Sequence, residues 1–290
     1  MNIVREPLLA QCAQQRQYDA PFKMLLDNKH LEVLLIDFED ERMILVSRDI
    51  TETERVDAMR RDFIANASHE LRTPLTVISG FLEHAQDEPN MPMDERVKQI
   101  DLMRHQAERM TVLIQDMLML SRLEADVHVD AQNIVMPALL NQQIQSAQAL
   151  SAGRHQIHAE IAPINIKGSE QEIASVVGNL LSNAVRYTLE GGDIYLTWQL
   201  NAEKQPTLTV RDTGLGIASE HIPRLTERFY RVNTAQSRAT KGTGLGLAIV
   251  KHVLQRHGAT LDIASTLGKG STFSVTFPAS RCRVLAQRKV

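Results

Sequence analysis

The chain has 290 residues, and its 32 Lys and Arg against 35 Asp and Glu give a net charge of −3. Overall basicity therefore gives no support for direct nucleic-acid binding. No run approaches the roughly 18 apolar residues that a membrane span needs, and the first residues lack the apolar region of a signal peptide. Cys12 and Cys282 lie near opposite ends and predict neither a disulfide framework nor a metal cluster. These observations indicate a soluble chain from a reducing compartment, long enough for two domains.

The N-terminal part predicts a small piece of β-sheet. Residues 1–30 show only weak periodicity, whereas residues 31–38 and 43–47 are rich in β-formers on either side of a charged turn. An isolated hairpin is marginal in water and should belong to a larger sheet. Too little sequence precedes it to supply one, so the domain is either very small or begins before the first residue.

Two long helices follow. Apolar residues recur every three or four positions from Val56 to Leu82 and again from Val97 to Leu120, with a proline-rich break over 87–92. This pattern predicts an antiparallel helical hairpin. Two helices cannot enclose their own apolar faces, so we expect a homodimer with a four-helix bundle. A bundle within one chain would need two more long helices, which the sequence does not offer.

The remaining residues predict an α+β domain. Residues 127–138 are expected to be a linker ending near Pro137, and strand-like and helix-like segments alternate beyond it. The expected helices are 170–187 and 245–257, and the expected strands are 194–200, 207–211, 261–265 and 272–277. The last two strands form a hairpin.

One helical face of this domain carries chemistry. Asn179, Asn183, Arg186 and Tyr187 fall on one side of the expected helix 170–187. Carboxamide oxygens suit Mg²⁺ and arginine suits phosphate. The alternative is an ordinary solvated helix face.

Two glycine-rich segments flank a basic one. Residues 212–217 begin with Asp212 directly after a strand, and residues 242–247 open a helix, where backbone amides bind anions. Either segment alone is compatible with an ordinary turn. The second lacks the Walker lysine and follows no βαβ unit, so neither a P-loop nor a Rossmann site fits. Residues 226–241 combine several cations with an aromatic pair, namely Arg228, Arg231, Arg238, Lys241, Phe229 and Tyr230. This combination is typical of a mobile lid over phosphates. The alternative is a solvated loop.

The first long helix contains an unusual segment at residues 68–75. His69 is offset from the apolar stripe and should be exposed, with Thr73 one turn further on the same face. Glu70 is adjacent and could orient or deprotonate an imidazole. Pro74 removes the hydrogen bond to the Glu70 carbonyl, so a kink is expected beside the histidine.

Together these segments resemble the two-component sensor histidine kinases. Residues 68–75 resemble their phosphoacceptor box, 179–187 their N box, 212–216 and 242–246 their glycine boxes, and 229–231 their F box, all in the family's order. Residues 63–69 and 222–232 are most similar to the phosphate-regulon sensors within that family. Residues 31–53 resemble the last strands and exit of a PAS domain. The resemblance implies a partial PAS domain over 1–52, a dimerisation and phosphotransfer hairpin over 53–126, the linker, an ATP-binding α/β sandwich of the GHKL type over 139–280 and a tail over 281–290.

The resemblance also implies roles. His69 would be phosphorylated from Mg-ATP, Glu70 would accept or orient its proton, and Thr73 would position water for dephosphorylating the partner. Asn183 would hold Mg²⁺ with help from Asn179, and Asp212 would bind the adenine amino group. Further nucleotide-site positions are Arg186, Tyr187, Gly214, Gly216, Phe229, Arg231, Lys241, Gly242, Gly244 and Gly246.

The implied partner is the receiver domain of a response regulator, of the winged-helix phosphate-regulon type. Two departures from the family stand out. Arg186 replaces the usual lysine of the N box, and the membrane segments and complete PAS domain of the full-length sensors are absent from this sequence. The family anchors this cytoplasmic part to the inner membrane through those segments. The alternative function is a GHKL-fold ATPase or a signalling scaffold without phosphotransfer.

Overall fold

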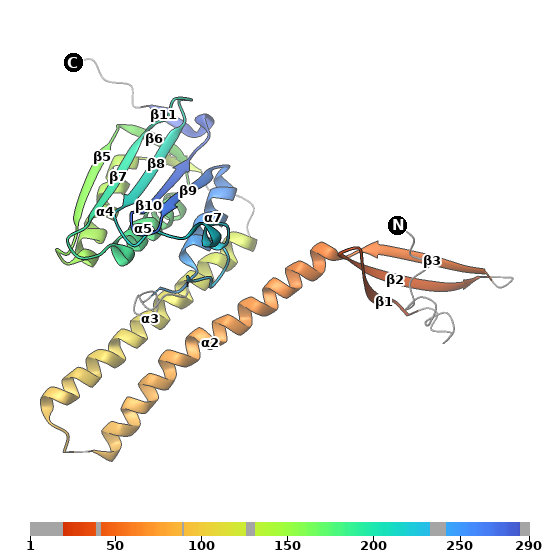
Figure 1. Ribbon diagram of the computed structural model, residues 1–290, viewed down its shortest axis with the longest axis horizontal. Coiled ribbons are helices and arrows are strands. Elements are labelled where there is room, and N and C mark those ends of the chain that lie inside the picture. The colour runs from red at the N-terminus through yellow and green to blue at the C-terminus, as the bar shows by residue number, and fades with distance from the viewer. Residues whose placement is uncertain (1–19, 39–41, 89, 126–130, 233–241, 285–290) are drawn as a thin grey trace. The chain divides into compact units, whose positions relative to one another are not determined.

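The computed structural model describes residues 20–38, 42–88, 90–125, 131–232 and 242–284. These residues fall in two units, 1–69 and 70–290, and one long helix runs through the boundary. Figure 1 labels the elements. Among the described helices, none combines the length and apolar character needed to cross a membrane.

The N-terminal unit contains a three-stranded antiparallel sheet in the order β1-β2-β3, formed by Phe22–Leu26, Lys29–Phe38 and Arg42–Asp49. The predicted hairpin of β2 and β3 is confirmed. Strand β1 was not predicted, because the apolar Leu25 occupies an exposed position and hides the alternation that its burial pattern shows. Met24 packs with Leu31, Val33 and Leu35. The PAS assignment stays a prediction.

The two predicted long helices are confirmed as α2 (Thr51–Asp87) and α3 (Met93–Ala125). Asp49 marks the start of α2, because its Oδ1 accepts hydrogen bonds from Thr51 Oγ1 at 2.6 Å and Thr51 N at 3.0 Å. These bonds lower the pKa of Asp49 to about 2. Helix α2 continues past Pro74, and the expected kink stays a prediction.

Much of the apolar stripe of the hairpin remains exposed in the single chain. Leu75, Leu82 and Ile100 are all more than half exposed. This exposure agrees with the expectation that a second chain covers the stripe, and the dimer itself stays a prediction.

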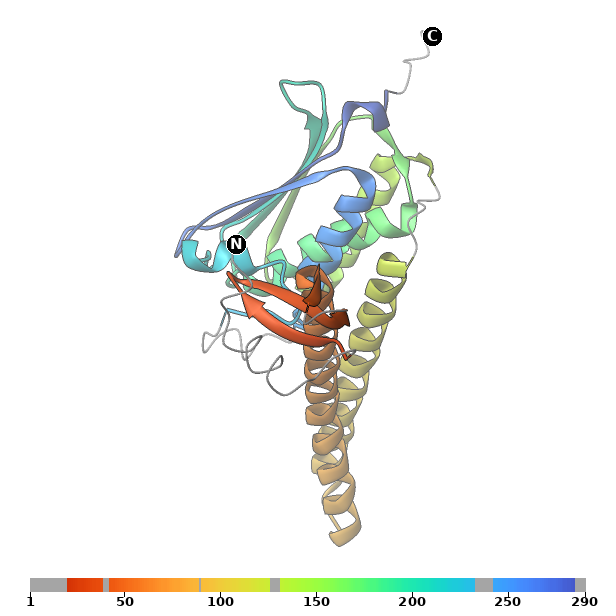
Figure 2. The same ribbon diagram turned by 90° about the vertical axis from the view of Figure 1, so that its right-hand side faces the viewer.

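The C-terminal domain is a layered α/β structure, as predicted. Its main sheet has the order β5-β7-β8-β10-β9, and a smaller sheet has the order β11-β6-β4. Helices α4, α5 and α7 pack against the sheets (Figures 1 and 2). The helices are Met136–Ser151, Glu170–Tyr187 and Gly246–His257. The strands, in numerical order from β4 to β11, are Gln132–Ile134, Gln156–Ile161, Ile164–Gly168, Asp193–Leu200, Pro206–Asp212, Thr260–Thr266, Gly270–Thr276 and Cys282–Val284. Two short 3₁₀ helices, η2 and η3, span Ser219–Arg224 and Ala279–Arg281.

The expected linker and tail were both too long. Strand β4 pairs with β6 inside the expected linker, and α4 begins before Pro137. A proline in the first helical turn is favourable, so Pro137 marks a helix start and not the end of a linker. At the other end, β11 pairs with β6 through Cys282 and Ile166, within the expected tail.

Trp198 connects the two sheets of this domain. It lies on β7, is fully buried, and donates from Nε1 to the Ile164 carbonyl on β6 at 2.9 Å. Its ring meets Phe277 edge to face, with centroids 6.1 Å apart. One side chain thus provides a hydrogen bond and a large apolar contact.

Replacing Trp198 with Phe should lower the free energy of unfolding of this domain by about 2–4 kcal/mol, because a cavity forms and a buried carbonyl loses its donor. Urea unfolding followed by circular dichroism measures the change. Tyr195→Phe, on the half-exposed side of the same strand, is the control and should change it by less than about 1 kcal/mol. Equal effects of the two variants would contradict the assigned role of Trp198.

Candidate functional site

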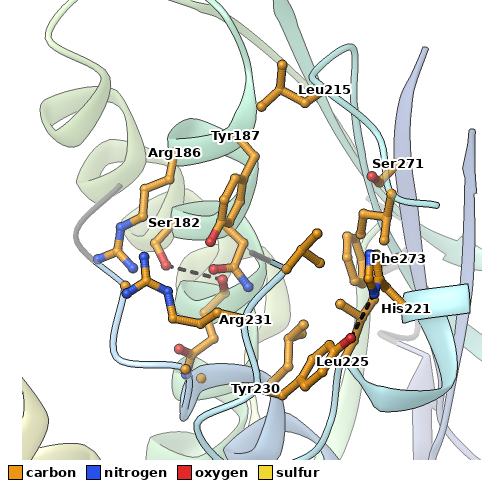
Figure 3. A pocket seen from close by; sticks show the side chains of 18 of the residues that line it. Ser182, Arg186, Tyr187, Leu215, His221, Leu225, Tyr230, Arg231, Ser271 and Phe273 are labelled. Atoms are coloured by element: carbon orange, nitrogen blue, oxygen red, sulfur yellow. Dashed lines mark hydrogen bonds between the residues drawn. The ribbon is translucent and has the colours of Figure 1, made fainter. Parts of the chain in front are cut away.

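A cavity of about 670 Å³ lies in the C-terminal unit, within the size range of small-molecule sites. Its walls come from α5, the turn after β8, η2, the segment that leads into α7, strand β10 and one side of α3. Figure 3 shows the side chains that converge on it. Most of the sequence-predicted nucleotide residues line it, namely Asn179, Asn183, Arg186, Tyr187, Asp212, Gly216, Arg231, Gly242, Gly244 and Gly246.

Helix α5 supplies one wall because its two faces differ. Its apolar stripe, which includes Ile173, Val177 and Leu181, is buried, so Asn179 and Asn183 are left on the cavity side. The Asn179 Nδ2 donates to the Ser175 carbonyl at 2.9 Å, which orients its carboxamide.

The oriented Asn179 lies against the start of α7. A Cβ on Gly246 would lie 2.3 Å from Asn179 Oδ1, so a larger residue fits there only if the Asn179 side chain moves. The N-terminus of α7 is thereby held against the asparagine wall. Backbone amides at such a helix start bind anions.

Asp212, the last residue of β8, also lines the cavity. It is 5% exposed, and its Oδ1 accepts backbone hydrogen bonds from Gly214 at 2.9 Å and Ser271 at 3.2 Å. Burial raises the pKa of this carboxyl, and the two backbone donors oppose the rise. Gly214 is not among the described lining residues; its role is to donate to Asp212.

Gly216 lets the chain turn beside Asp212. It has φ of +67°, and a Cβ there would lie 2.0 Å from the Thr266 carbonyl oxygen. Both the backbone conformation and the close approach therefore require glycine.

A basic region and an apolar region lie on different sides of the cavity. Figure 3 shows the guanidinium groups of Arg186 and Arg231 close together, and Phe273 and Leu225 on the opposite side. A ligand with a flat apolar part and an anionic part matches this division. Tyr187 lies between the two regions in the same view.

The F box differs in detail from the prediction. Phe229 does not appear among the described lining residues; it has φ of +60°, and its backbone N donates to the Gly244 carbonyl at 2.9 Å. The next residue, Tyr230, lines the cavity, and its hydroxyl is 2.8 Å from His221 Nδ1. Lys241 lies outside the described residues.

Other lining residues were missed by sequence reasoning. Ser271 and Phe273 sit on β10, where ordinary strand alternation gives no sign of a site. His221 stands alone in η2, without a motif around it.

Helix α3 also reaches the cavity. Asp116 and Val112 line it, and Asp116 Oδ2 accepts a hydrogen bond from Thr243 Oγ1 at 2.8 Å. Burial raises the pKa of Asp116. Nearby, Glu124 forms an ion pair with Arg228. No sequence pattern distinguishes these acids, since they look like polar positions of a long amphipathic helix.

The predicted phosphoacceptor segment lies on α2. His69 and Thr73 are exposed, as predicted, and Glu70 is partly buried. Glu70 Oε2 accepts from Arg109 Nη2 of α3 at 2.9 Å. None of His69, Glu70 and Thr73 is among the described residues that line the cavity.

The cavity residues fit a magnesium nucleotide. The asparagine oxygens are hard ligands for Mg²⁺, the arginines suit phosphate, and the buried Asp212 carboxylate can accept from a base amino group. In the described part of the chain, no group of three or more His, Cys, Asp or Glu side chains is placed to hold a metal ion.

Two family models match the chain. Residues 59–126 match the His Kinase A (phospho-acceptor) domain, and residues 168–281 match the histidine kinase-, DNA gyrase B- and HSP90-like ATPase family. These matches coincide with the helical hairpin and with most of the cavity-bearing domain.

Similar proteins include several sensors. The chain is 43% identical over 282 residues to the phosphate regulon sensor protein PhoR of Pseudomonas aeruginosa, 95% of this chain and 63% of that protein. It is 37% identical to PhoR of Haemophilus influenzae, over 89% of this chain and 61% of that protein. The sensor protein SrrB of Staphylococcus aureus is 34% identical, over 81% of this chain and 41% of that protein. The chain thus spans less than two thirds of the length of these relatives.

Solved structures show the same fold. The Acinetobacter baumannii histidine kinase AdeS superposes with a TM-score of 0.60 at 22% identity, over 73% of this chain and 98% of AdeS. Full-length ShkA in complex with AMPPNP superposes with a TM-score of 0.55 at 25% identity, over 78% of this chain and 46% of ShkA. With its phosphoacceptor hairpin followed by the histidine-kinase type of ATPase domain, the chain belongs to the sensor histidine kinases.

Proposed function

We propose that the chain binds Mg-ATP in the cavity, phosphorylates His69 and passes the phosphoryl group to an aspartate of a response regulator. The single observation that carries the nucleotide step is that one cavity is lined both by a buried carboxylate, that of Asp212, and by two arginines, Arg186 and Arg231. The exposed His69 on a helix that matches the phosphoacceptor family carries the transfer step.

Each cavity residue has a task in this proposal. Asp212 accepts from the adenine amino group, and Tyr187 packs near the base. Arg186 and Arg231 neutralise phosphate charge, and the amides before α7 bind phosphate oxygens. Asn183 holds Mg²⁺, with Asn179 assisting. The metal ion would neutralise charge that develops on the transferring phosphoryl group.

The transfer itself needs a nucleophile and a proton acceptor. Imidazole acts as a nucleophile in its neutral form, through the nitrogen that carries no proton. One nitrogen of His69 forms a bond to the γ-phosphorus as the bond between that phosphorus and the bridging oxygen breaks, which releases ADP. The proton on the other nitrogen passes to the Glu70 carboxylate. When the phosphoryl group then passes to a receiver aspartate and the nitrogen–phosphorus bond breaks, the proton returns from Glu70 to the imidazole and the histidine is restored.

The biological setting is part of the proposal. Similarity to two PhoR proteins supports phosphate-starvation signalling and a winged-helix regulator as partner. The exposed apolar stripe supports a homodimer. The chain would work on the cytoplasmic side of the inner membrane, anchored through segments outside this sequence.

Replacing His69 with Gln should abolish phosphorylation. The purified chain is incubated with Mg²⁺ and γ-labelled ATP, and acid-labile, alkali-stable label is counted. The wild type should be labelled and His69→Gln should lose at least about 99% of the label, because the proposed transfer requires the imidazole nitrogen as nucleophile. His84→Gln, another exposed histidine on α2, is the control and should be labelled normally. Label on His69→Gln would remove His69 as acceptor, and an unlabelled wild type that still hydrolyses ATP would favour the plain ATPase.

Replacing Asp212 with Asn should weaken ADP binding about 10–100-fold, because the adenine amino group would lose a charged acceptor. Titration calorimetry measures the affinity. Asp193→Asn, at the start of β7 and paired with His158 at 2.8 Å, should bind ADP like the wild type. Unchanged binding by Asp212→Asn would contradict the adenine assignment.

The same pair gives a pH test. Because burial raises the pKa of Asp212, its carboxylate becomes protonated at higher pH than an ordinary aspartate. The ratio of wild-type to Asp212→Asn affinity should therefore fall towards one as the pH falls through that pKa. A ratio that stays constant down to the ordinary aspartate range would contradict the role of the ionised carboxylate.

We also propose that the chain dephosphorylates the regulator, with Thr73 positioning the attacking water. Thr73→Ala should lower the rate of regulator dephosphorylation about tenfold or more while His69 labelling stays within about twofold, because only the former step uses this hydroxyl. Loss of label from a phosphorylated receiver domain measures the rate. Thr76→Ala, one turn away from Arg72 and hydrogen-bonded to its carbonyl, is the control. A parallel loss of both activities in Thr73→Ala would contradict the separation.

A further inference from the structure

An ion pair between the two long helices ends on the residue next to the proposed phosphoacceptor. Arg109 Nη2 of α3 donates to Glu70 Oε2 of α2 at 2.9 Å, across 39 positions of sequence. Three other basic residues of the hairpin pair locally instead. Arg55, Lys98 and Arg104 each pair with an acid three or four residues away on the same helix.

The surroundings of this pair favour a fixed geometry. The side chains of Arg109 and Glu70 are 26% and 35% exposed, whereas those of Arg104 and Asp101 are 61% and 54% exposed. Partial burial reduces the competition from water for both groups. An ion pair at such exposure adds little to stability. Its larger effect is to restrict the orientations of the Glu70 carboxylate.

The position of Glu70 gives that restriction a chemical meaning. Glu70 directly follows His69 on α2, and it is the residue to which the proposed transfer assigns the imidazole proton. Arg109 contacts only Oε2 in the hydrogen bond that joins them. The second oxygen, Oε1, keeps the capacity to accept a proton.

We propose that Arg109 is a positioning residue for autophosphorylation of His69. By holding Oε2 it orients the Glu70 carboxylate, so that Oε1 can take the imidazole proton as the bond to phosphorus forms and the phosphorus–oxygen bond of ATP breaks. Arg109 itself exchanges no proton, because a guanidinium stays charged at any relevant pH. This inference rests on the proposed function.

The chemistry of arginine makes the proposal specific. A planar guanidinium presents donors in a fixed direction, whereas a lysine ammonium is a point charge on a flexible stem. The Arg109→Lys variant should keep the positive charge and lose part of the orientation of the Glu70 carboxylate. The Arg109→Ala variant should lose both the charge and the orientation.

The test is a kinetic comparison in the full chain. Arg109→Ala should lower kcat for His69 labelling about tenfold, the size typical of lost orientation of a reacting group. KM for ATP should stay within about twofold, because Arg109 is not among the described residues that line the cavity. Arg109→Lys should recover part of kcat. Arg104→Ala, on the same helix, is the matched control and should behave as wild type.

A double variant tests whether Arg109 acts through Glu70. In a Glu70→Gln background the carboxylate is gone, so adding Arg109→Ala should change kcat by less than about twofold. An equal tenfold loss in both backgrounds would overturn the proposal, as would a wild-type kcat in Arg109→Ala. If circular dichroism shows that Arg109→Ala loses helix, Arg109→Lys decides, and a wild-type kcat there overturns the proposal.

The failure of this inference differs from the failure of the proposed function. If the wild type carries no label on His69, the proposed function fails. If the wild type is labelled and the Arg109 variants label equally fast, only the role of Arg109 fails.

Discussion

Helices α5 and α7 meet where a side chain on Gly246 would collide with Asn179, at a separation of 2.3 Å between its Cβ and the Asn179 Oδ1. This close approach places the N-terminus of one helix against the polar face of the other. The anion-binding amides and the metal-binding carboxamides come to share one wall for that reason. A larger residue at position 246 would collide with Asn179 and force its carboxamide away from this wall.

The same packing constraint explains why α5 tolerates two asparagines and an arginine. Its opposite face carries seven buried residues, from Ile173 to Val185, and that burial stabilises the helix regardless of its polar face. The site can therefore hold residues chosen for chemistry. Asp212 is likewise held in place by the structure around it. The paired strands β7 and β8 keep its carboxylate buried, although burial of a charged group is unfavourable in itself.

Sequence reasoning succeeded where one strong pattern governed a whole element. The stripe within residues 170–187 predicted α5 with its actual bounds, and the glycine segments lie at the cavity as expected. It failed where a residue had two possible meanings. Pro137 was read as the end of a linker, although it lies in the first turn of α4. Phe229 was expected at the nucleotide, but its positive φ turns the chain and leaves Tyr230 at the cavity.

The remaining misses come from tertiary contacts. Asp116, Ser271 and Arg109 acquire their roles from partners that are far away in sequence, and nothing local marks them. No single-sequence pattern encodes such pairs.

The hydrogen bond between Asp116 and Thr243 makes α3 part of the cavity wall. A ligand that draws Thr243 away from Asp116 must break this bond, and the breakage costs free energy that depends on how α3 is held. By thermodynamic linkage, breaking the Asp116–Thr243 hydrogen bond changes ligand affinity by a certain factor, and ligand binding changes the equilibrium constant for breaking that bond by the same factor. A movement of α3 that breaks this bond would therefore change the affinity of the cavity for its ligand, and a binding measurement would detect that movement.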